Sequence, residues 1–191
     1  MRSCTDVHNF LHEEDVAHEI IHLPALADTA RRAADLLGVS LAEVVKTLLF
    51  YLDTRPALVL VPGDRQASPE LIRRVAGCSE VALARPFEVL QITGFRAGAL
   101  PPCGLAVEIL TFADPEVFAR PVIYCGGGTT TTMLKMRSED LRRVARPLVA
   151  SLTEPAESAG AGEAGEGGGT AGTGAEDRNG RGASARGHAG A

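Results

Sequence analysis

The C-terminal part of the chain lacks the residues from which a hydrophobic core is built. From residue 153 to residue 191 the sequence contains 12 Gly and 10 Ala, but no Val, Ile, Leu, Met, Phe, Tyr or Cys. Such a segment cannot bury enough apolar surface to offset the conformational entropy that folding removes. We therefore predict a folded body over residues 1–152, the size of one ordinary domain, followed by a disordered Gly/Ala-rich tail over residues 153–191.

Helical and strand patterns alternate along the body, which predicts a mixed α/β domain with one main, mixed sheet packed by helices. Capping residues and terminal glycines or prolines indicate helices over residues 4–17, 30–37, 69–76, 86–92 and 138–146, with a short turn of helix after Ser40. Apolar and β-branched runs indicate strands over residues 18–23, 46–52, 57–61, 105–110, 121–125 and 129–136. The second and third strands follow each other closely, so we expect them to form a hairpin.

Two glycine-rich segments lie between these elements. Residues 93–104 contain three glycines, among them Gly98, and two prolines, which predicts a loop with unusual backbone angles. Residues 126–128 are three consecutive glycines. Such segments can present backbone N–H groups to an anion or an oxyanion, because no side chain obstructs them. Each segment alone is a weak signal, but together with a lone lysine they indicate one shared pocket.

Lysine is rare in this chain, because 17 of its 19 basic residues are Arg and only Lys46 and Lys135 are Lys. Lys46 stands between two apolar pairs, residues 44–45 and 48–49, at the start of a predicted strand. Its compact positive charge suits a carbonyl or phosphate oxygen. The alternative is a lysine at a strand end that extends its ammonium to solvent. Lys135 alternates with apolar residues and is expected to be an exposed strand residue.

Other chemistries have weaker support in the sequence. Four of the five histidines lie before residue 23 and the fifth is in the predicted tail, which disfavours a Ser-His-Asp triad. Cys4, His8 and His12 could line one helical face as a metal site, but no fourth ligand is evident, and an exposed polar helix is the favoured interpretation. Cys125, beside the glycines, could be a nucleophile, although a buried strand-end cysteine fits better.

Charge and composition exclude several classes of partner. The formal net charge is −5, and the tail holds six acidic and three basic residues, which leaves −2 on the body. This balance argues against a DNA-binding surface but permits a small contact with one nucleotide end. No apolar run is long enough to span a membrane. Neither glycine segment matches a dinucleotide or phosphate-loop motif, so we expect no cofactor. Without CxxC pairs or an apolar signal segment, we expect free thiols in a reducing cytoplasm.

A set of motifs along the body resembles a known family. These are Thr29-Ala30-Arg31-Arg32-Ala33-Ala34 with Leu37-Gly38-Val39, Val45-Lys46-Thr47-Leu48, Leu58-Val59-Leu60-Val61-Pro62-Gly63-Asp64, Thr93-Gly94-Phe95 with Gly98, Pro102 and Gly104, and Gly128 with Asp140-Leu141. In order and spacing they are similar to the YbaK/ProX family of aminoacyl-tRNA deacylases, which includes the editing domain inserted in bacterial prolyl-tRNA synthetases. The resemblance covers roughly residues 10–150 and implies that family's fold, with a single curved sheet.

The resemblance implies hydrolysis of a mischarged aminoacyl ester on a proline-type tRNA by a domain acting in trans. In the family, the lysine that matches Lys46 positions the terminal adenosine and ester, and backbone amides of the loop that matches Gly98 stabilise the carbonyl oxygen. The implied substrate contacts are Thr47, Phe95, Gly126, Gly128 and Thr129. No enzyme nucleophile or metal is implied. The implied partners are the acceptor end of an aminoacyl-tRNA and an aminoacyl-tRNA synthetase.

Several residues depart from the family pattern. The chain has Ala99 after Gly98, and Gly126, Thr129, Thr130 and Met133 where some members carry charged or other polar residues. The sequence therefore leaves the identity of the removed amino acid open. These departures and the acidic pI of about 5.5 also leave a second hypothesis, a non-catalytic module of the same fold that binds an aminoacyl-tRNA end or a nucleotide.

Overall fold

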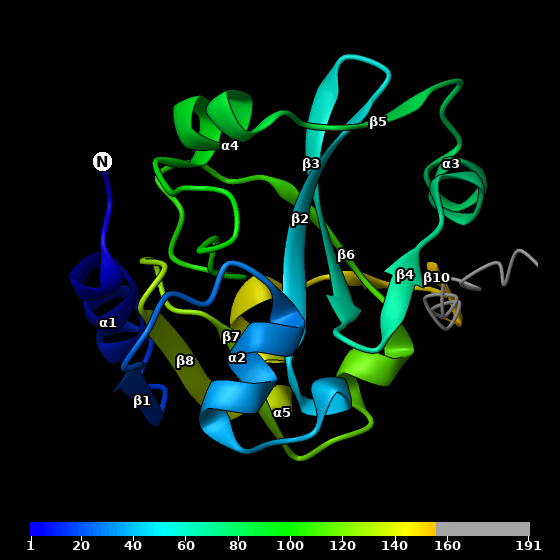
Figure 1. The fold of residues 1–191 in the computed structure, drawn as a ribbon. Helices are drawn as coiled ribbons and strands as arrows, with labels where there is room; N and C mark the ends of the chain where they lie inside the picture. Colours follow the sequence, from blue (N-terminus) through cyan, green and yellow to red (C-terminus); the bar gives the residue numbers. More distant parts are fainter. Residues whose placement is uncertain (156–191) are drawn as a thin grey trace, which may run out of the picture. The chain divides into compact units, whose positions relative to one another are not determined.

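The structure is a computed structural model, and it describes residues 1–155. Its helices are α1 (Cys4–Glu13), α2 (Ala30–Leu37), α3 (Pro69–Ala76), α4 (Pro86–Thr93) and α5 (Ser138–Ala145), with 3₁₀ turns η1 (Leu41–Glu43) and η2 (Pro115–Phe118). The strands are β1 (His18–His22), β2 (Val45–Leu52), β3 (Arg55–Pro62), β4 (Arg65–Ala67), β5 (Val81–Leu83), β6 (Leu110–Ala113), β7 (Val122–Gly126), β8 (Thr132–Arg137), β9 (Leu148–Val149) and β10 (Thr153–Pro155). Figure 1 shows the β2–β3 hairpin running through the centre of this part of the chain. No helix among these residues is long and apolar enough to cross a membrane.

Within residues 1–155 the strands form three sheets, where one main sheet was predicted. A five-stranded sheet has the order β5-β2-β3-β6-β9, a three-stranded sheet the order β1-β8-β7, and β4 pairs with β10. The large sheet is mixed, because β5, β2 and β3 pair antiparallel whereas β6 pairs parallel with β3 and β9. A single parallel bridge between Val44 and Tyr124 joins the region before β2 to β7. The two larger sheets thus meet without sharing a ladder, and the mixed α/β class is confirmed.

Local capping rules place the helices close to the predicted positions, except that α1, which was predicted over residues 4–17, ends at Glu13, just before Asp15 takes a left-handed φ of 52°. The Thr29 hydroxyl accepts the Arg32 N–H at 3.2 Å at the start of α2, and Gly38 ends this helix with φ of 67°. Ser68 caps α3, whose first residue is proline, and Gly77 ends it with φ of 64°. A side-chain oxygen at the N-cap satisfies an otherwise unpaired N–H, and glycine adopts the left-handed angle without strain.

Two predicted strands are displaced in the structure. The strand expected over residues 105–110 begins at Leu110 and runs to Ala113, where it pairs with β3. Residues 105–109 are equally apolar, but the middle of that run is exposed, so composition alone chose the wrong segment. The strand expected from Thr129 begins at Thr132, because the hydroxyl of Thr132 accepts the Thr129 N–H and closes a turn. Four short strands, β4, β5, β9 and β10, were not predicted.

The folded body extends beyond the predicted boundary at residue 152. Leu152 is fully buried, and β10 pairs antiparallel with β4 immediately after it. Figure 1 shows these two short strands side by side. The predicted boundary weighed only apolar side chains, whereas a strand is also held by backbone hydrogen bonds. The rest of the predicted tail, residues 156–191, lies outside the described residues.

Neighbouring residues of the β2–β3 hairpin supply different cores. Leu49, Leu58 and Leu60 belong to a cluster that also contains Phe95 and residues of α1 and α5. Phe50, Leu52, Val59 and Val61 belong to a second cluster against Ile72 of α3, which also contains Leu152. A third cluster lies beneath α2. Because side chains alternate along a strand, the hairpin packs on both of its faces.

Leu152 tests whether the end of the body contributes to folding. We expect Leu152→Ala to lower the free energy of unfolding by about 2–5 kcal/mol, because it leaves a cavity in the second core. Leu148→Ala is the matched control: Leu148 is 55% exposed in β9, so its effect stays within about 0.5 kcal/mol. Urea denaturation of the full chain measures both. Equal effects of the two substitutions would contradict the placement of Leu152.

Candidate functional site

The triple glycine packs directly on the glycine-proline loop. The Gly128 N–H donates to the Ala99 carbonyl at 3.0 Å, and the Gly127 N–H donates to the Thr132 carbonyl at 3.1 Å. A Cβ at Gly126 would lie within 3.0 Å of the Leu100 backbone, a distance that real Cβ atoms do not adopt. Glycine is required because two backbone segments approach each other here without room for a side chain.

Gly98 offers an unoccupied backbone donor. The residue is exposed and has φ of 83°, an angle that favours glycine. A Cβ at this position would lie 3.2 Å from the carbonyl oxygen of Asp28, just before α2. Within residues 1–155 the Gly98 N–H donates to no protein acceptor, whereas the neighbouring Ala99 N–H donates to Arg96. The Gly98 amide is therefore available to a ligand.

Three threonine hydroxyls cluster beside the glycines. The Thr129 Oγ1 lies 2.9 Å from the Thr132 Oγ1 and 3.4 Å from the Thr131 Oγ1. The carbonyl of Thr130 accepts the Ala27 N–H at 2.8 Å, which holds the turn against the segment before α2. Thr129 is half-buried. The turn thus presents a small, uncharged and polar wall next to the glycine loop.

Lys46 lies on β2 with its ammonium bound to the protein's own backbone. Its Nζ donates to the Gly63 carbonyl at 3.3 Å and to the Arg65 carbonyl. Burial lowers the pKa of the Lys46 ammonium, and the nearby Asp64 carboxylate opposes this shift. An ammonium has three N–H donors, so two carbonyl contacts leave one for a further partner. The expected alternative, a lysine that extends freely to solvent, does not describe this half-buried group.

The main chain at Lys46 lies close to the glycine turn. Val44 and Tyr124 form the parallel bridge, and Lys46 and Gly126 each lie two residues beyond it in the same direction. The structure thus brings Gly98, Gly126, Gly128 and Thr129 together, with the start of β2 alongside them. The hydrogen bonds of the Lys46 ammonium lie away from these glycines, at the turn between β3 and β4.

Thr47 and Phe95, two of the predicted substrate contacts, both face the first core. Thr47 pairs with Leu60 and faces the first core, opposite to Lys46. Its hydroxyl is buried and has no hydrogen-bond partner in the described part of the chain. Phe95 is fully buried, and the Arg2 guanidinium lies 5.9 Å from its ring centre. Phe95 belongs to the core that carries the glycine loop and half-buried Thr47 faces it, and a direct substrate contact by either stays a prediction.

The alternative chemistries gain no support from the structure. Among residues 1–155 no group of three or more His, Cys, Asp and Glu is arranged to hold a metal ion. His8 instead contacts His18, with Nδ1 and Nε2 2.9 Å apart. Cys125 is fully buried, and burial raises the pKa of its thiol well above the usual value, so it is a core residue and not a nucleophile. All four cysteines are unpaired.

Sequence reasoning missed the backbone groups that surround the predicted residues. These are the carbonyls of Arg65 and Leu100 and the start of α1, whose backbone lies against Gly128. Backbone groups carry no sequence signature. Of the residues whose carbonyls bind Lys46, only Gly63 lies in one of the family-like motifs. A groove of about 730 Å³, lined by residues such as Leu58, Cys103, Glu108 and Val144, contains none of the predicted site residues.

The sequence and the fold have counterparts among known proteins. The model of the aminoacyl-tRNA editing domain matches residues 25–144, and the chain belongs to this family. It is 34% identical over 107 residues to the proline–tRNA ligase of Maridesulfovibrio salexigens, a match that covers 56% of this chain and 18% of the ligase. The proline–tRNA ligase of Geobacillus sp. (strain WCH70) is 34% identical over 108 residues, 56% of this chain and 19% of the ligase. The chain thus matches less than a fifth of the length of these ligases.

Solved structures agree with this assignment. A crystal structure described as that of a proposed trans-editing enzyme for prolyl tRNA synthetase superposes with a TM-score of 0.74 and 27% identity, covering 81% of this chain and 98% of that one. A hypothetical protein of known structure superposes with a TM-score of 0.74 and 29% identity, covering 78% of this chain and 99% of that one. The resemblance to the YbaK/ProX type of editing domain is thereby confirmed.

Gly126 tests the contact between the glycine turn and the loop. Its φ is not in the left-handed region. If there were room for a Cβ, alanine would therefore stabilise the protein by about 0.4–1 kcal/mol, because it lowers the conformational entropy of the unfolded chain. We expect Gly126→Ala instead to lower the free energy of unfolding by about 1–3 kcal/mol, because the Leu100 backbone must move. Thermal and urea denaturation measure the sign. A stabilised variant would show that the loop does not touch this residue.

The two lysines should titrate in separate steps. Burial lowers the pKa of Lys46, whereas the Glu19 carboxylate, 3.1 Å from the Lys135 ammonium, raises the pKa of Lys135. A chain labelled with ¹³C at lysine Cε gives two lysine signals, and we expect Lys46 to lose its proton at the lower pH. Lys135→Arg assigns the signals, and Glu19→Gln should lower the pKa of Lys135 alone. Coincident titrations would contradict the burial of Lys46.

Proposed function

We propose that this editing domain hydrolyses the ester of a mischarged aminoacyl-tRNA, acting in trans on a proline-type tRNA. The free amide of exposed Gly98, held in a loop braced by the triple glycine, carries this proposal. Such a donor stabilises the oxyanion that forms when an ester carbonyl is attacked. The likeness to proline–tRNA ligases and to a proposed trans-editing enzyme supports the choice of tRNA and an encounter with a synthetase. The cytoplasm, where tRNA is charged, is the proposed place of action.

The reaction needs no nucleophile from the protein. Water adds to the ester carbonyl carbon, and the Gly98 N–H binds the oxygen that becomes negative. The bond from this carbon to the ribose oxygen then breaks, and the ribose oxygen takes up a proton. The products are the free amino acid and the uncharged tRNA. Cys125 is buried, and the histidines of residues 1–155 all lie on or next to α1 and β1, so water or a hydroxyl of the substrate itself is the proposed attacking group.

Lys46 and the threonines would hold the substrate. The remaining N–H of the Lys46 ammonium, which lies on the side away from the glycine loop, is proposed to bind an oxygen of the terminal adenosine, since a charged donor binds phosphate oxygens strongly. The turn with Thr129 and Gly126 would border the amino acid side chain. Its walls are small and uncharged, which suits a small aliphatic side chain better than a charged one.

Lys46→Ala tests the catalytic proposal. We expect this substitution to slow single-turnover deacylation of a mischarged proline-type tRNA on the order of 100-fold, because a preorganised donor is lost. Lys135→Ala is the control, since Lys135 forms an exposed pair with Glu19 on the three-stranded sheet. The assay offers a panel of mischarged tRNAs to the full chain. Tight binding of aminoacyl-tRNA without turnover would overturn the proposal and identify a non-catalytic binding module.

A further inference from the structure

We propose that β10, anchored by Asp114, is a positioning element for Lys46. β10 holds β4, and β4 together with the turn before it supplies the two carbonyl oxygens that bind the Lys46 ammonium. The catalytic consequence of this arrangement rests on the proposed function, but the structural linkage does not. β10 lies after the range matched by the editing-domain model, which ends at residue 144.

Backbone carbonyls hold the Lys46 ammonium, so its position depends on where that backbone lies. Gly63 is in the turn after β3, and Arg65 is the first residue of β4. No side chain has to be conserved for these contacts, but both carbonyls must stay in place. β4 has only three residues, and the only strand that pairs with it within residues 1–155 is β10. Without β10, the segment that carries the Arg65 carbonyl has no ladder to hold it.

The register of β10 leaves the Arg65 carbonyl free for Lys46. The Ser68 N–H donates to the Leu152 carbonyl at 2.8 Å, and hydrogen-bonded and non-hydrogen-bonded pairs alternate along an antiparallel ladder. The next hydrogen-bonded pair is therefore Glu154 with Gln66, and Arg65 stands at a non-hydrogen-bonded position opposite residue 155. The Arg65 carbonyl thus faces away from β10. Residue 155 is a proline, which this position tolerates because it requires no N–H.

Asp114 fastens the start of β10 to the central sheet. Asp114 is 2% exposed, and its Oδ2 accepts the Leu152 N–H at 3.0 Å and the Thr153 hydroxyl at 2.8 Å. Its Oδ1 accepts the Glu116 N–H at 3.0 Å, and its own N–H donates to the Leu60 carbonyl of β3. A buried carboxylate is stable only when its oxygens are bonded in this way. Asp114 therefore connects β10 to β3, the strand next to Lys46.

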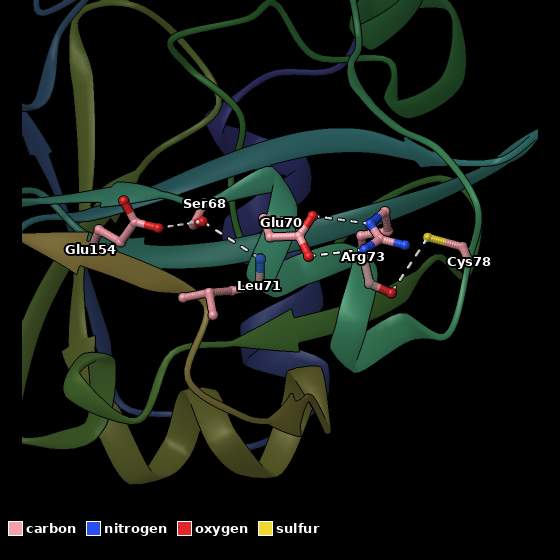
Figure 2. Close-up of polar contacts among 6 residues, drawn as sticks. All are labelled: Ser68, Glu70, Leu71, Arg73, Cys78 and Glu154. Carbon is pink, nitrogen blue, oxygen red and sulfur yellow. Dashed lines mark hydrogen bonds and ion pairs between the residues drawn. The ribbon is translucent and has the colours of Figure 1, made fainter.

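A second attachment fixes the outer part of β10. Figure 2 shows the Glu154 carboxylate accepting the Ser68 hydroxyl, at 2.7 Å, while the Ser68 oxygen accepts the Leu71 N–H at the start of α3. In the same view Glu70 and Arg73 form an exposed pair within α3. β10 is thus held mainly by Asp114 and by its backbone pairs with β4, and the exposed Glu154 carboxylate adds one contact to Ser68. Loosening it would release the Arg65 carbonyl and return the Lys46 ammonium to water.

The experiment compares Glu154→Pro with Glu154→Ala in the full chain labelled with ¹³C at lysine Cε. Proline removes the N–H that the Glu154–Gln66 pair requires, whereas alanine keeps it and removes only the carboxylate. We expect the pKa of Lys46 to rise toward its ordinary value in Glu154→Pro and to stay close to the unsubstituted chain in Glu154→Ala. The Lys135 signal is the internal control and should not move. An unchanged or lowered Lys46 pKa in Glu154→Pro, or equal shifts in both variants, would overturn the proposal.

Deacylation provides the second readout. We expect Glu154→Pro to slow the reaction on the order of tenfold, because Lys46 is misplaced, and to add nothing in a Lys46→Ala background. A further loss in that background would contradict a role through Lys46. If the chain shows no deacylation at all, the proposed function fails while the lysine titration still decides the linkage. Should Glu154→Pro not fold, Thr153→Val replaces it: an upward shift of the Lys46 pKa supports the linkage, and no shift overturns it.

Discussion

The antiparallel pairing of β2 with β3 determines the direction in which each neighbouring side chain of the site points. Lys46 pairs with Val61 and lies on the side of α3, whereas Thr47 pairs with Leu60 and lies on the side of the glycine loop. These adjacent residues therefore have different surroundings. Carbonyl oxygens bind the Lys46 ammonium, whereas the Thr47 hydroxyl is buried and has no hydrogen-bond partner within residues 1–155. A shift of register by one residue would exchange these roles.

Backbone groups make up most of the candidate site. The glycine turn contacts the loop through main-chain atoms, the free donor is the Gly98 amide, and the Lys46 ammonium is held by main-chain carbonyls. The positions of main-chain groups depend on how whole segments pair and pack. Short remote elements, such as β10 with its anchor Asp114, therefore acquire influence over the site without contacting a substrate.

The predictable parts of the fold are those decided by neighbours in sequence. Caps at Thr29 and Ser68, and glycines at residues 38 and 77, mark helix ends because their hydrogen bonds and backbone angles are local. Strand β6 was misplaced because residues 105–109 and Leu110–Ala113 are both apolar, and only pairing with β3 chooses between them. β10 was missed for the same reason, since its partner β4 lies some 88 residues earlier in the chain.

The sequence by itself determined most helix limits, although not the end of α1, together with the central hairpin, the two glycine segments and the choice of Lys46, because composition, spacing and local capping carry that information. Its motifs were also sufficient to indicate the editing-domain family, which the comparisons confirm. Only the tertiary structure decided that the strands divide among three sheets, that Phe95 is fully buried, and that the Lys46 ammonium is held by Gly63 and Arg65. These features are contacts between distant segments, and a backbone carbonyl is the same in every residue, so no sequence pattern announces which one will be used.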